Sequence, residues 1–533
     1  MANHILSTII TLQQLVMNKN QTAVLNKETK TVWLILFGLL LIRVAPAIVI
    51  AVLTRGNTPL LQFDQSVYLM GADAILLGEQ NPFNFFPPLQ FMFIAAVLYI
   101  SNGLISSAVI AGAFVGWLTV VGIYLLADLL FDRKTALFSA VLCGIYPGLV
   151  TYGVLLTSET LAIFFIVFAF LLILRYLYYG GWYKLAGAGI LWGLASQTRG
   201  GLHYFIAGVM LALIIQRTGR SWRQACAGAL AFAIISLGTF FAIGLAVAPF
   251  HGNTALNSKS GLGSVIHGAN RITTSCEDYG DILGNIFYDV NNTKEQWPEG
   301  SDLFFQMNIM EKSTIEIGSA FLTFILEEPA TYFYNSLKKW SCLWSPNQYA
   351  IKTIKYHLYY KNAFGAEIAC LMISIFYGIV LCTGIWGVAI SRDRFRPFFI
   401  LLVLFYLALI FLAVGNSKLR LPMMPFFIMY SAYFIVTLLR DKSKVRAAVR
   451  NKWIAILLVI LISNGIIKYR EILLTPAEIK VRKIELCTRL GFPKTALRLH
   501  EDYKNFPFYN ESQKKRLQKT SSEADRFLKE GLK

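Results

Sequence analysis

Glu159 is the only charged residue between Ala136 and Leu174, and Tyr146-Pro147 breaks the apolar stretch before it. A charge at the centre of a bilayer costs about 2.5 to 3.5 kcal/mol on insertion scales, so such a carboxylate either lies at a helix end or is kept for chemistry. A glutamate at a helix start, favoured by the helix dipole, is the structural alternative. In a functional site, this carboxylate could orient a substrate, assist a base or help to hold a divalent ion.

Hydrophobic residues make up 56% of the 533 residues and charged residues only 15%. This balance excludes a soluble domain and predicts an all-α polytopic integral membrane protein. Apolar runs of about 17 to 25 residues predict about eleven transmembrane helices in this sequence. They lie near residues 32–54, 104–131, 136–150, 159–178, 184–198, 200–216, 224–249, 364–390, 397–414, 421–439 and 452–468.

Lysine and arginine gather in the loops at one end of these helices, and positive residues are retained on the cytoplasmic side. The segments 55–103, 151–158, 250–363 and 415–420 are then outside, and an odd number of spans also puts the tail from Tyr469 outside. Positive-inside retention and anionic lipid headgroups explain the net charge of +19. We find no nucleic-acid-binding module.

Five regions follow from this topology. They are a cytoplasmic N-terminal segment (1–31), a transmembrane module (32–249) with the first outer loop (55–103), an outer loop with amphipathic interfacial helices (250–363), C-terminal transmembrane helices (364–468) and a polar tail (469–533). In the first outer loop, a helix over 64–78 would place Asp64, Tyr68 and Ala72 on one face. A second helix, over 89–100, is expected to lie in the membrane interface. The tail could form two small helices, over 475–491 and 493–503.

Several short motifs follow one another in an order that occurs in a known family. They are Asp64-x3-Tyr68-x3-Ala72, Gly78, Pro87-Pro88-Leu89, Tyr146-Pro147, Ser158-Glu159, Thr198-Arg199 and Lys418-Leu-Arg420-Leu-Pro422. Through them, roughly residues 30–440 resemble the GT-C polytopic glycosyltransferases, with the protein O-mannosyltransferases and the lipid A aminoarabinose transferases as the closest groups. The resemblance implies a GT-C-like bundle with juxtamembrane helices at the outer face. It also implies an inverting transfer of sugar from a polyprenyl-phosphate donor to an acceptor hydroxyl at that face.

The resemblance further implies that the first two outer loops each supply an acid to one pocket, and Asp64 and Glu159 occupy the matching positions. An acceptor hydroxyl is a poor nucleophile at neutral pH, and a carboxylate that takes its proton contributes about 10²- to 10⁴-fold. We therefore expect Asp64 to be the catalytic base and Glu159 to be its partner in the site. A loop aspartate that caps a helix is the structural alternative for Asp64.

Three cations lie at predicted outer ends of spans, against the positive-inside trend. Arg199, Lys418 and Arg420 are therefore expected to bind the donor phosphate, whose negative charge grows as it leaves. Their alternative is snorkelling to lipid headgroups. Tyr68 and His251 are expected in the acceptor pocket, with an interfacial tyrosine and a structural histidine as the alternatives.

Metal and cysteine chemistry are only weakly indicated. The sequence has no CxxC pair and no HExxH, so no protein-built zinc site is expected, while a divalent cation (Mg or Mn) is left open as a cofactor. Cys276 and Cys342 share an outer segment and could form a disulfide. Arg43, midway along the first span, should pair with an acid on a neighbouring helix or mark a misplaced boundary.

The expected partners are a polyprenyl-phosphate sugar donor, membrane lipids and a glycolipid, lipopolysaccharide, polysaccharide or protein acceptor. We expect a bacterial inner (plasma) membrane protein with its site facing the periplasm or exterior. Two other functions stay open. A lipid-linked glycan polymerase or ligase would differ in the acceptor, and a secondary transporter or flippase would often carry an internal repeat, which we do not find.

Overall fold

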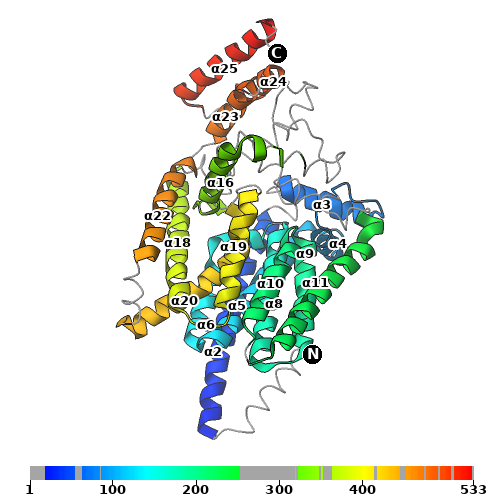
Figure 1. Ribbon diagram of the computed structural model, residues 1–533. Helices are drawn as coiled ribbons and strands as arrows, with labels where there is room; N and C mark the ends of the chain where they lie inside the picture. The colour runs from blue at the N-terminus through cyan, green and yellow to red at the C-terminus, as the bar shows by residue number, and fades with distance from the viewer. Residues whose placement is uncertain are drawn as a thin grey trace.

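The fold is known from a computed structural model that describes residues 19–53, 63–83, 86–217, 219–251, 325–346, 363–412, 417–443, 452–472, 476–489, 492–505 and 509–530, with a few more between 319 and 354. Every regular element in these ranges is a helix, which confirms the expected all-α fold class. Most of the helices stand side by side in one bundle (Figure 1).

Six helices among the described residues are long and apolar enough to cross a membrane. They are α2 (Lys19–Leu53), α5 (Ile105–Leu130), α8 (Ser158–Tyr179), α11 (Trp222–His251), α18 (Ala363–Ile390) and α20 (Met424–Arg440) with the preceding 3-10 helix η3 (Ser417–Met423). A bent pair, α6 (Arg133–Ile145) and α7 (Pro147–Gly153), would make a seventh span. The other helices of the bundle are α9 (Trp182–Thr198), η1 (Leu202–Phe205) with α10 (Ile206–Ile215), α19 (Arg396–Leu412) and α22 (Lys452–Ile472).

Every span expected from the sequence overlaps one of these helices. By length and composition, six or seven crossings are supported within the described ranges, against about eleven expected. Helix length contributes to the difference: α9 and α19 have 17 residues each, which reach about 25 Å at about 1.5 Å per residue, whereas the hydrocarbon core is about 30 Å thick.

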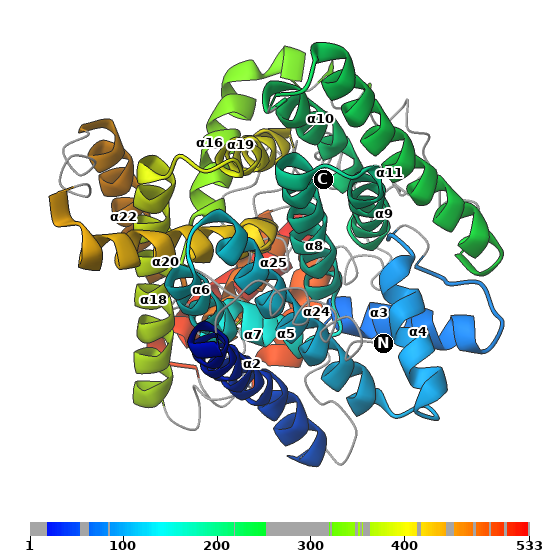
Figure 2. The same cartoon turned by 90° about the horizontal axis from the view of Figure 1, so that it is seen from below.

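Helix α8 forms the centre of the bundle. It packs against α9 and α5, α9 packs against α11, and α18 packs against α20. A view from below shows α8 with α5, α9 and α10 around it (Figure 2). Phe170 of α8 is fully buried and meets Trp192, Phe395 and Phe426 edge-on, with ring centroids 5.0–5.5 Å apart. Such edge-to-face pairs add to the burial of apolar area, so this core holds the middle of α8 within the bundle.

The chain bends by 60° between α6 and α7, where Pro147 begins the second helix. Proline has no N–H, so the carbonyl of Cys143, four residues earlier, loses its helical partner. Arg43 of α2 donates to that carbonyl at 2.6 Å and to the carbonyl of Leu149 at 2.5 Å. The expectation that Arg43 pairs with an acid or marks a misplaced boundary is therefore wrong, because the broken helix supplies backbone acceptors inside the bundle.

Three helices lie at the end of the bundle where α8 begins. They are α3 (Phe63–Leu76), α4 (Leu89–Ile100) and α16 (Pro329–Leu343), drawn at the upper end of the bundle in Figure 1. The helices expected over 64–78 and 89–100 are thus confirmed as elements. Most of the expected outer loop 250–363 lies outside the described residues.

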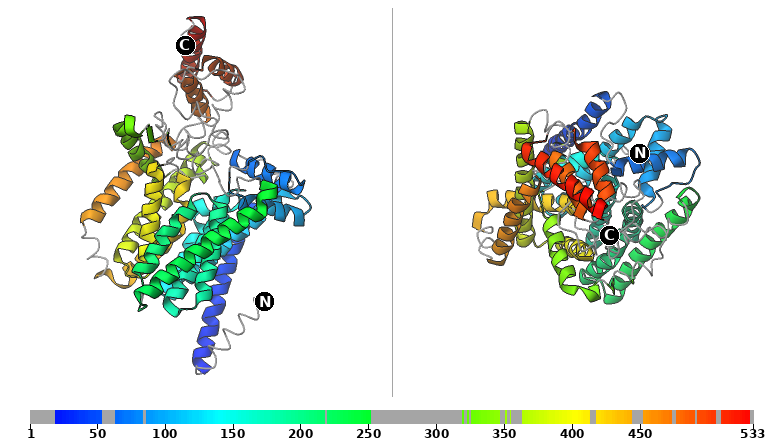
Figure 3. Two further views of the ribbon diagram at one scale, coloured as in Figure 1. Left: turned by 45° about the vertical axis from the view of Figure 1, so that its right-hand side comes forward. Right: turned by 90° about the horizontal axis from the view of Figure 1, so that it is seen from above.

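Beyond that end, α23 (Pro476–Arg489), α24 (Pro493–Tyr503) and α25 (Glu511–Glu530) pack against one another (Figure 3). The two small helices expected in the tail are confirmed. The third, α25, was not expected, because polar residues dominate it and few apolar positions, such as Leu517 and Ala524, are buried.

One disulfide involves the end of the bundle where α16 lies. Cys342, near the end of α16, is disulfide-bonded, and Cys276, its expected partner, lies outside the described residues. Five other cysteines in the described ranges form no disulfide, namely Cys143, Cys226, Cys370, Cys382 and Cys487.

Candidate active site

Glu159 lies in the first turn of α8, and its side chain is only 3% exposed. Its Oε1 accepts a hydrogen bond from Nη1 of Arg199 at 2.6 Å, which makes a buried ion pair. Arg199 directly follows the last residue of α9, so the antiparallel packing of α8 and α9 brings the two residues together. Charge-assisted bonds of this length are among the strong ones in proteins.

Two further elements bring polar groups to this pair. Lys418 of η3 interacts electrostatically with Glu159, and η3 packs against the start of α8. Tyr406 of α19 and Tyr152 of α7 interact electrostatically with Arg199. One acid and two cations thus gather at one end of the bundle, in surroundings where water is scarce.

Asp64 lies in the first turn of α3, and its side chain is outside what the structure describes. The next residue, Gln65, is buried, and its Oε1 accepts a hydrogen bond from the N–H of Leu156 at 3.2 Å. Leu156 belongs to the turn that leads directly to Glu159. The first turn of α3 is therefore attached to the turn before α8, which places the backbones of Asp64 and Glu159 in neighbouring segments.

Tyr68 is buried within the hydrophobic cluster under α3. Its ring packs against Phe91 at 4.9 Å and Phe86 at 5.6 Å between centroids. The side chain is 5% exposed. Its ring therefore anchors α3 on α4 and the loop that precedes α4.

His251, the last residue of α11, is 1% exposed and uses both ring nitrogens. Nδ1 lies 3.0 Å from Nδ2 of Asn81, and Nε2 lies 2.8 Å from the carbonyl oxygen of Phe86. Because an amide nitrogen is a donor and a carbonyl is an acceptor, the ring is neutral with its proton on Nε2. The backbone N–H of Asn81 also donates to the carbonyl of Phe250 at 2.8 Å. His251 thus ties the end of α11 to the loop between α3 and α4.

The guanidinium of Arg420 is buried at the junction of η3 and α16. It donates to the carbonyl of Leu343 at 2.5 Å and to the carbonyl of Ser345. Its central carbon also lies 4.2 Å from the centroid of the Tyr377 ring. These contacts hold η3 against the end of α16. Of the three expected phosphate-binding cations, Arg199 and Lys418 therefore come together at Glu159, whereas Arg420 engages a different set of partners.

The described residues show no cluster of ligands for a divalent cation. Nowhere in the described ranges do three side chains of the metal-ligating kinds His, Cys, Asp and Glu gather. The Glu159 carboxylate has Arg199 as its partner.

Sequence reasoning did not identify Gln65, Tyr152 or Tyr406. Gln65 is a polar residue buried in a juxtamembrane helix, and Tyr406 is one of few hydroxyl-bearing residues in the apolar helix α19. A search for polar side chains on otherwise apolar helix faces could have found Tyr406. Its proximity to Arg199 depends on helix packing and leaves no mark in the sequence.

The chain is similar to known proteins over part of its length. Residues 86–241 match the profile of the dolichyl-phosphate-mannose-protein mannosyltransferase family. That segment includes Glu159 and Arg199 and lies within residues 30–440. The match confirms the resemblance to GT-C polytopic glycosyltransferases.

Among solved structures, the archaeal oligosaccharyltransferase AglB from Archaeoglobus fulgidus, in complex with an inhibitory peptide and a dolichol-phosphate, aligns with a TM-score of 0.43 at 14% identity. The alignment covers 91% of this chain and 60% of that protein. The apo form of the Archaeoglobus fulgidus oligosaccharyltransferase aligns with a TM-score of 0.42 at 14% identity and covers 90% and 60% of the two chains. A search of curated proteins found no match.

Proposed function

We propose that this protein is an integral membrane glycosyltransferase that moves a sugar from a polyprenyl-phosphate donor to an acceptor hydroxyl. The observation that carries the proposal is the buried pair of Glu159 and Arg199, at a turn joined to the start of α3 through Gln65 and Leu156. The family match over residues 86–241 supports the class of reaction.

Asp64 is the proposed base. As the acceptor oxygen bonds to the sugar carbon, its proton passes to the Asp64 carboxylate and the bond from that carbon to the phosphate oxygen breaks. The lipid phosphate leaves with the bonding electrons. Direct displacement of this kind inverts the configuration at the sugar carbon. A base in this role should contribute about 10²- to 10⁴-fold.

Arg199 and Lys418 are the proposed contacts of the donor phosphate. Fixed cations in a site with little water stabilise developing negative charge far better than they would in bulk water. Glu159 holds the guanidinium of Arg199 at 2.6 Å, so we assign it the role of orienting Arg199. The remaining donor hydrogens of a guanidinium can still reach a phosphate.

Arg420, Tyr68 and His251 receive positioning roles in this proposal. Arg420 holds η3, which carries Lys418, against α16. Tyr68 and His251 hold the loop between α3 and α4, and with it the first outer segment. We expect them to act through the backbone that carries Asp64 and Lys418.

The proposed location is a bacterial inner membrane with the site facing the periplasm or exterior. The site lies at the end of the bundle opposite to the loops that contain Arg133, Arg217 and Arg394. Basic loops are retained in the cytoplasm, so the opposite end is the outer one.

The test is transfer from radiolabelled polyprenyl-phosphate sugars to extracted membrane acceptors by purified protein in matched detergent. Wild type is compared with Asp64→Asn and with Asp73→Asn, a matched control on an exposed position of the same helix. We expect Asp64→Asn to lose at least about 100-fold in rate and Asp73→Asn to stay close to wild type. Equal transfer rates in all three proteins would show that Asp64 is not the catalytic base. If wild type transfers sugar from none of the donors, the result would favour a transporter.

A further inference from the structure

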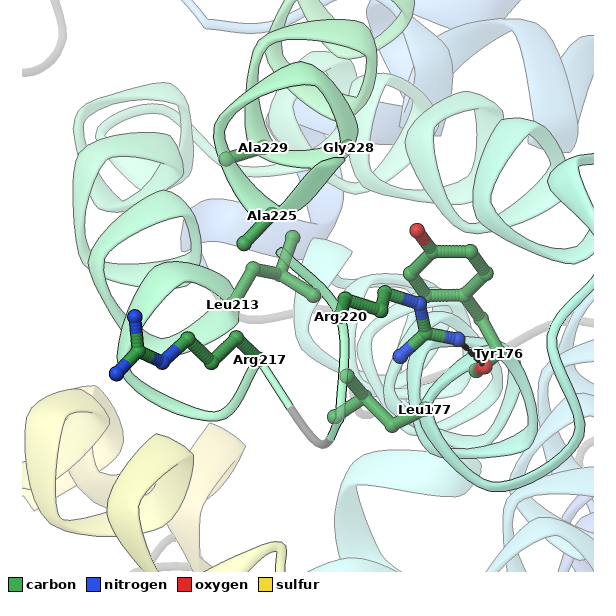
Figure 4. A pocket seen from close by; sticks show the side chains of 8 residues that line it. All are labelled: Tyr176, Leu177, Leu213, Arg217, Arg220, Ala225, Gly228 and Ala229. Carbon is green, nitrogen blue, oxygen red and sulfur yellow. Dashed lines mark hydrogen bonds between the residues drawn. The ribbon is translucent and has the colours of Figure 1, made fainter. Parts of the chain in front are cut away.

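A second polar site lies at the other end of α8, far along the helix from Glu159. A small, shallow notch opens there between α8, α10 and α11, with about 200 Å³ of space that includes open solvent (Figure 4). Arg217 and Arg220, from the loop between α10 and α11, flank an apolar wall that includes Leu177 and Leu213. The residues that line the notch include two cations and no acid.

Arg220 is held in a defined position. Its Nη2 donates to the carbonyl of Tyr176 at 2.8 Å, and its guanidinium carbon lies 4.4 Å from the centroid of the Tyr176 ring. Figure 4 shows this bond and the guanidinium beside the notch. A guanidinium fixed in this way loses little freedom when it binds a planar or tetrahedral anion. Arg217 is exposed on the other side.

The start of α11 forms a third wall. Ser221 and Gln224 bond reciprocally to each other's backbone N–H at the helix start, at 3.3 and 3.1 Å. The first turn of α11 contains no acidic residue, and Ala225 and Gly228, in the next positions, leave room in the notch. A helix N-terminus carries a partial positive charge, which adds to that of the two arginines.

Exposed aromatic residues place the notch at a membrane surface. Tyr179 ends α8, Trp182 begins α9 and Trp222 begins α11, and these side chains are 70%, 56% and 58% exposed. Tryptophan and tyrosine gather where lipid headgroups meet the hydrocarbon core. The two arginines therefore lie at the depth of lipid phosphates, with Leu177 and Leu213 on the acyl-chain side.

We propose that this notch binds the phosphate group of an anionic membrane lipid in the leaflet opposite to the candidate active site. The phosphate would bind Arg220 at the start of α11, and the exposed Arg217, whose guanidinium points away from Arg220 in Figure 4, would turn toward it. The glycerol and first acyl carbons would cover Leu177 and Leu213. Cationic side chains near a membrane surface attract anionic lipids. Arginine also binds phosphate with directed hydrogen bonds. The proposal does not depend on the transfer reaction.

The test is native mass spectrometry of delipidated protein titrated with phosphatidylglycerol or phosphatidylcholine. We expect phosphatidylglycerol to bind more tightly, and Arg217→Gln and Arg217→Gln/Arg220→Gln to weaken it, the double variant by at least about tenfold. Arg223→Gln is the matched control, because it removes the same charge from an exposed position in the same region that does not line the notch. It should stay within about twofold of wild type.

A second arm separates a lipid site from a site for small anions. Inorganic phosphate, added at increasing concentration, should not displace phosphatidylglycerol if the apolar wall contributes to binding. Arg217→Gln keeps the contacts of Arg220 with Tyr176, so it tests the site even if Arg220→Gln impairs folding. An equal loss in Arg223→Gln, an unchanged affinity in Arg217→Gln or full displacement by inorganic phosphate would each overturn the proposal.

Discussion

Glu159 and Arg199 depend on each other for their burial. Their side chains are 3% and 11% exposed, so each has lost most of its water and gains a charged partner instead. A buried pair is costly to form, and removing one partner leaves the other charge uncompensated, at about 3 to 5 kcal/mol. The pair therefore has a structural role at the same place where we propose that sugar transfer occurs.

The residue-scale prediction is a double-mutant cycle over this pair. Glu159→Gln and Arg199→Gln should each lower stability by about 3 to 5 kcal/mol, and the double variant should lose clearly less than the sum. Thermal unfolding in one detergent, followed by intrinsic fluorescence, measures the three changes. Additive losses would mean that the two side chains do not interact in the folded protein.

Transfer rates separate the two roles of this pair. If Glu159 orients Arg199 toward the donor phosphate, both single variants should slow transfer at saturating donor. The double variant should also transfer slowly, even though its stability is partly restored. Full recovery of the rate in the double variant would contradict a catalytic contribution from Arg199.

The break between α6 and α7 matters at the scale of elements. Pro147 frees the carbonyl of Cys143, and Arg43 of the neighbouring helix α2 donates a hydrogen bond to it. An unsatisfied carbonyl inside a protein costs about 1 to 3 kcal/mol. The position of the turn before Glu159 thus depends on a contact between α2 and the broken span.

The prediction at the scale of elements is a second double-mutant cycle, over Arg43 and Pro147. Arg43→Met should destabilise the protein by about 1 to 3 kcal/mol, because it leaves backbone carbonyls without a donor. Pro147→Ala restores a backbone N–H that can bond to the carbonyl of Cys143. Arg43→Met should therefore lower the free energy of unfolding less in a Pro147→Ala background. Thermal unfolding of the four proteins tests this, and an equal cost in both backgrounds would show that the carbonyl of Cys143 is not the acceptor that matters.

At the scale of the whole molecule, α23–α25 form a polar unit beyond the end of the bundle that carries α3 and α16 (Figures 1 and 3). Arg516 of α25 bonds Glu478 at 2.8 Å and Glu485 at 2.7 Å, both in α23. Burial alone would raise the pKa of the Glu478 carboxyl, but hydrogen bonds from Arg516, Gln513 and Arg482 outweigh it and lower that pKa.

The sign of the pH effect follows from this lowered pKa. The carboxylate of Glu478 stabilises the unit fully above the unfolded-state pKa of about 4.3, and this contribution is lost as the pH falls through the folded-state pKa. Hydrogen exchange of peptides from residues 476–530, corrected for intrinsic rates, should show lower protection below about pH 4. Arg516→Gln should weaken protection already at neutral pH, whereas Lys515→Gln, its exposed neighbour, should not. Unchanged protection in Arg516→Gln would contradict the role of the ion pairs.

The proposed topology makes a further prediction for the whole molecule. If the basic loops are cytoplasmic, Lys519→Cys in α25 should react with an impermeant maleimide in intact spheroplasts, and Ser221→Cys before α11 should react only after lysis. The parent protein gives the background from its own cysteines. The reverse labelling pattern would mean that the protein has the opposite orientation in the membrane and that the proposed site faces the cytoplasm.

Much of the architecture could be predicted from the sequence because apolar periodicity and helix length are local properties. The helices expected over 64–78, 89–100, 475–491 and 493–503 correspond to α3, α4, α23 and α24. Arg43 could not be interpreted in the same way. Its acceptors are backbone carbonyls about 100 positions away, and every residue type carries such a carbonyl, so the sequence holds no sign of which ones are free.

The sequence by itself determined the helical membrane fold, the resemblance to GT-C glycosyltransferases and the choice of Glu159 as an unusual carboxylate, because the cost of a charge in an apolar span depends on neighbours along the chain. Only the tertiary structure decided which cations meet that carboxylate. It paired Arg199 with Glu159 and engaged Arg420 with the end of α16. Both arginines lie at helix ends that the sequence predicts to be outer. Their partners follow from how the helices pack, which local sequence does not encode.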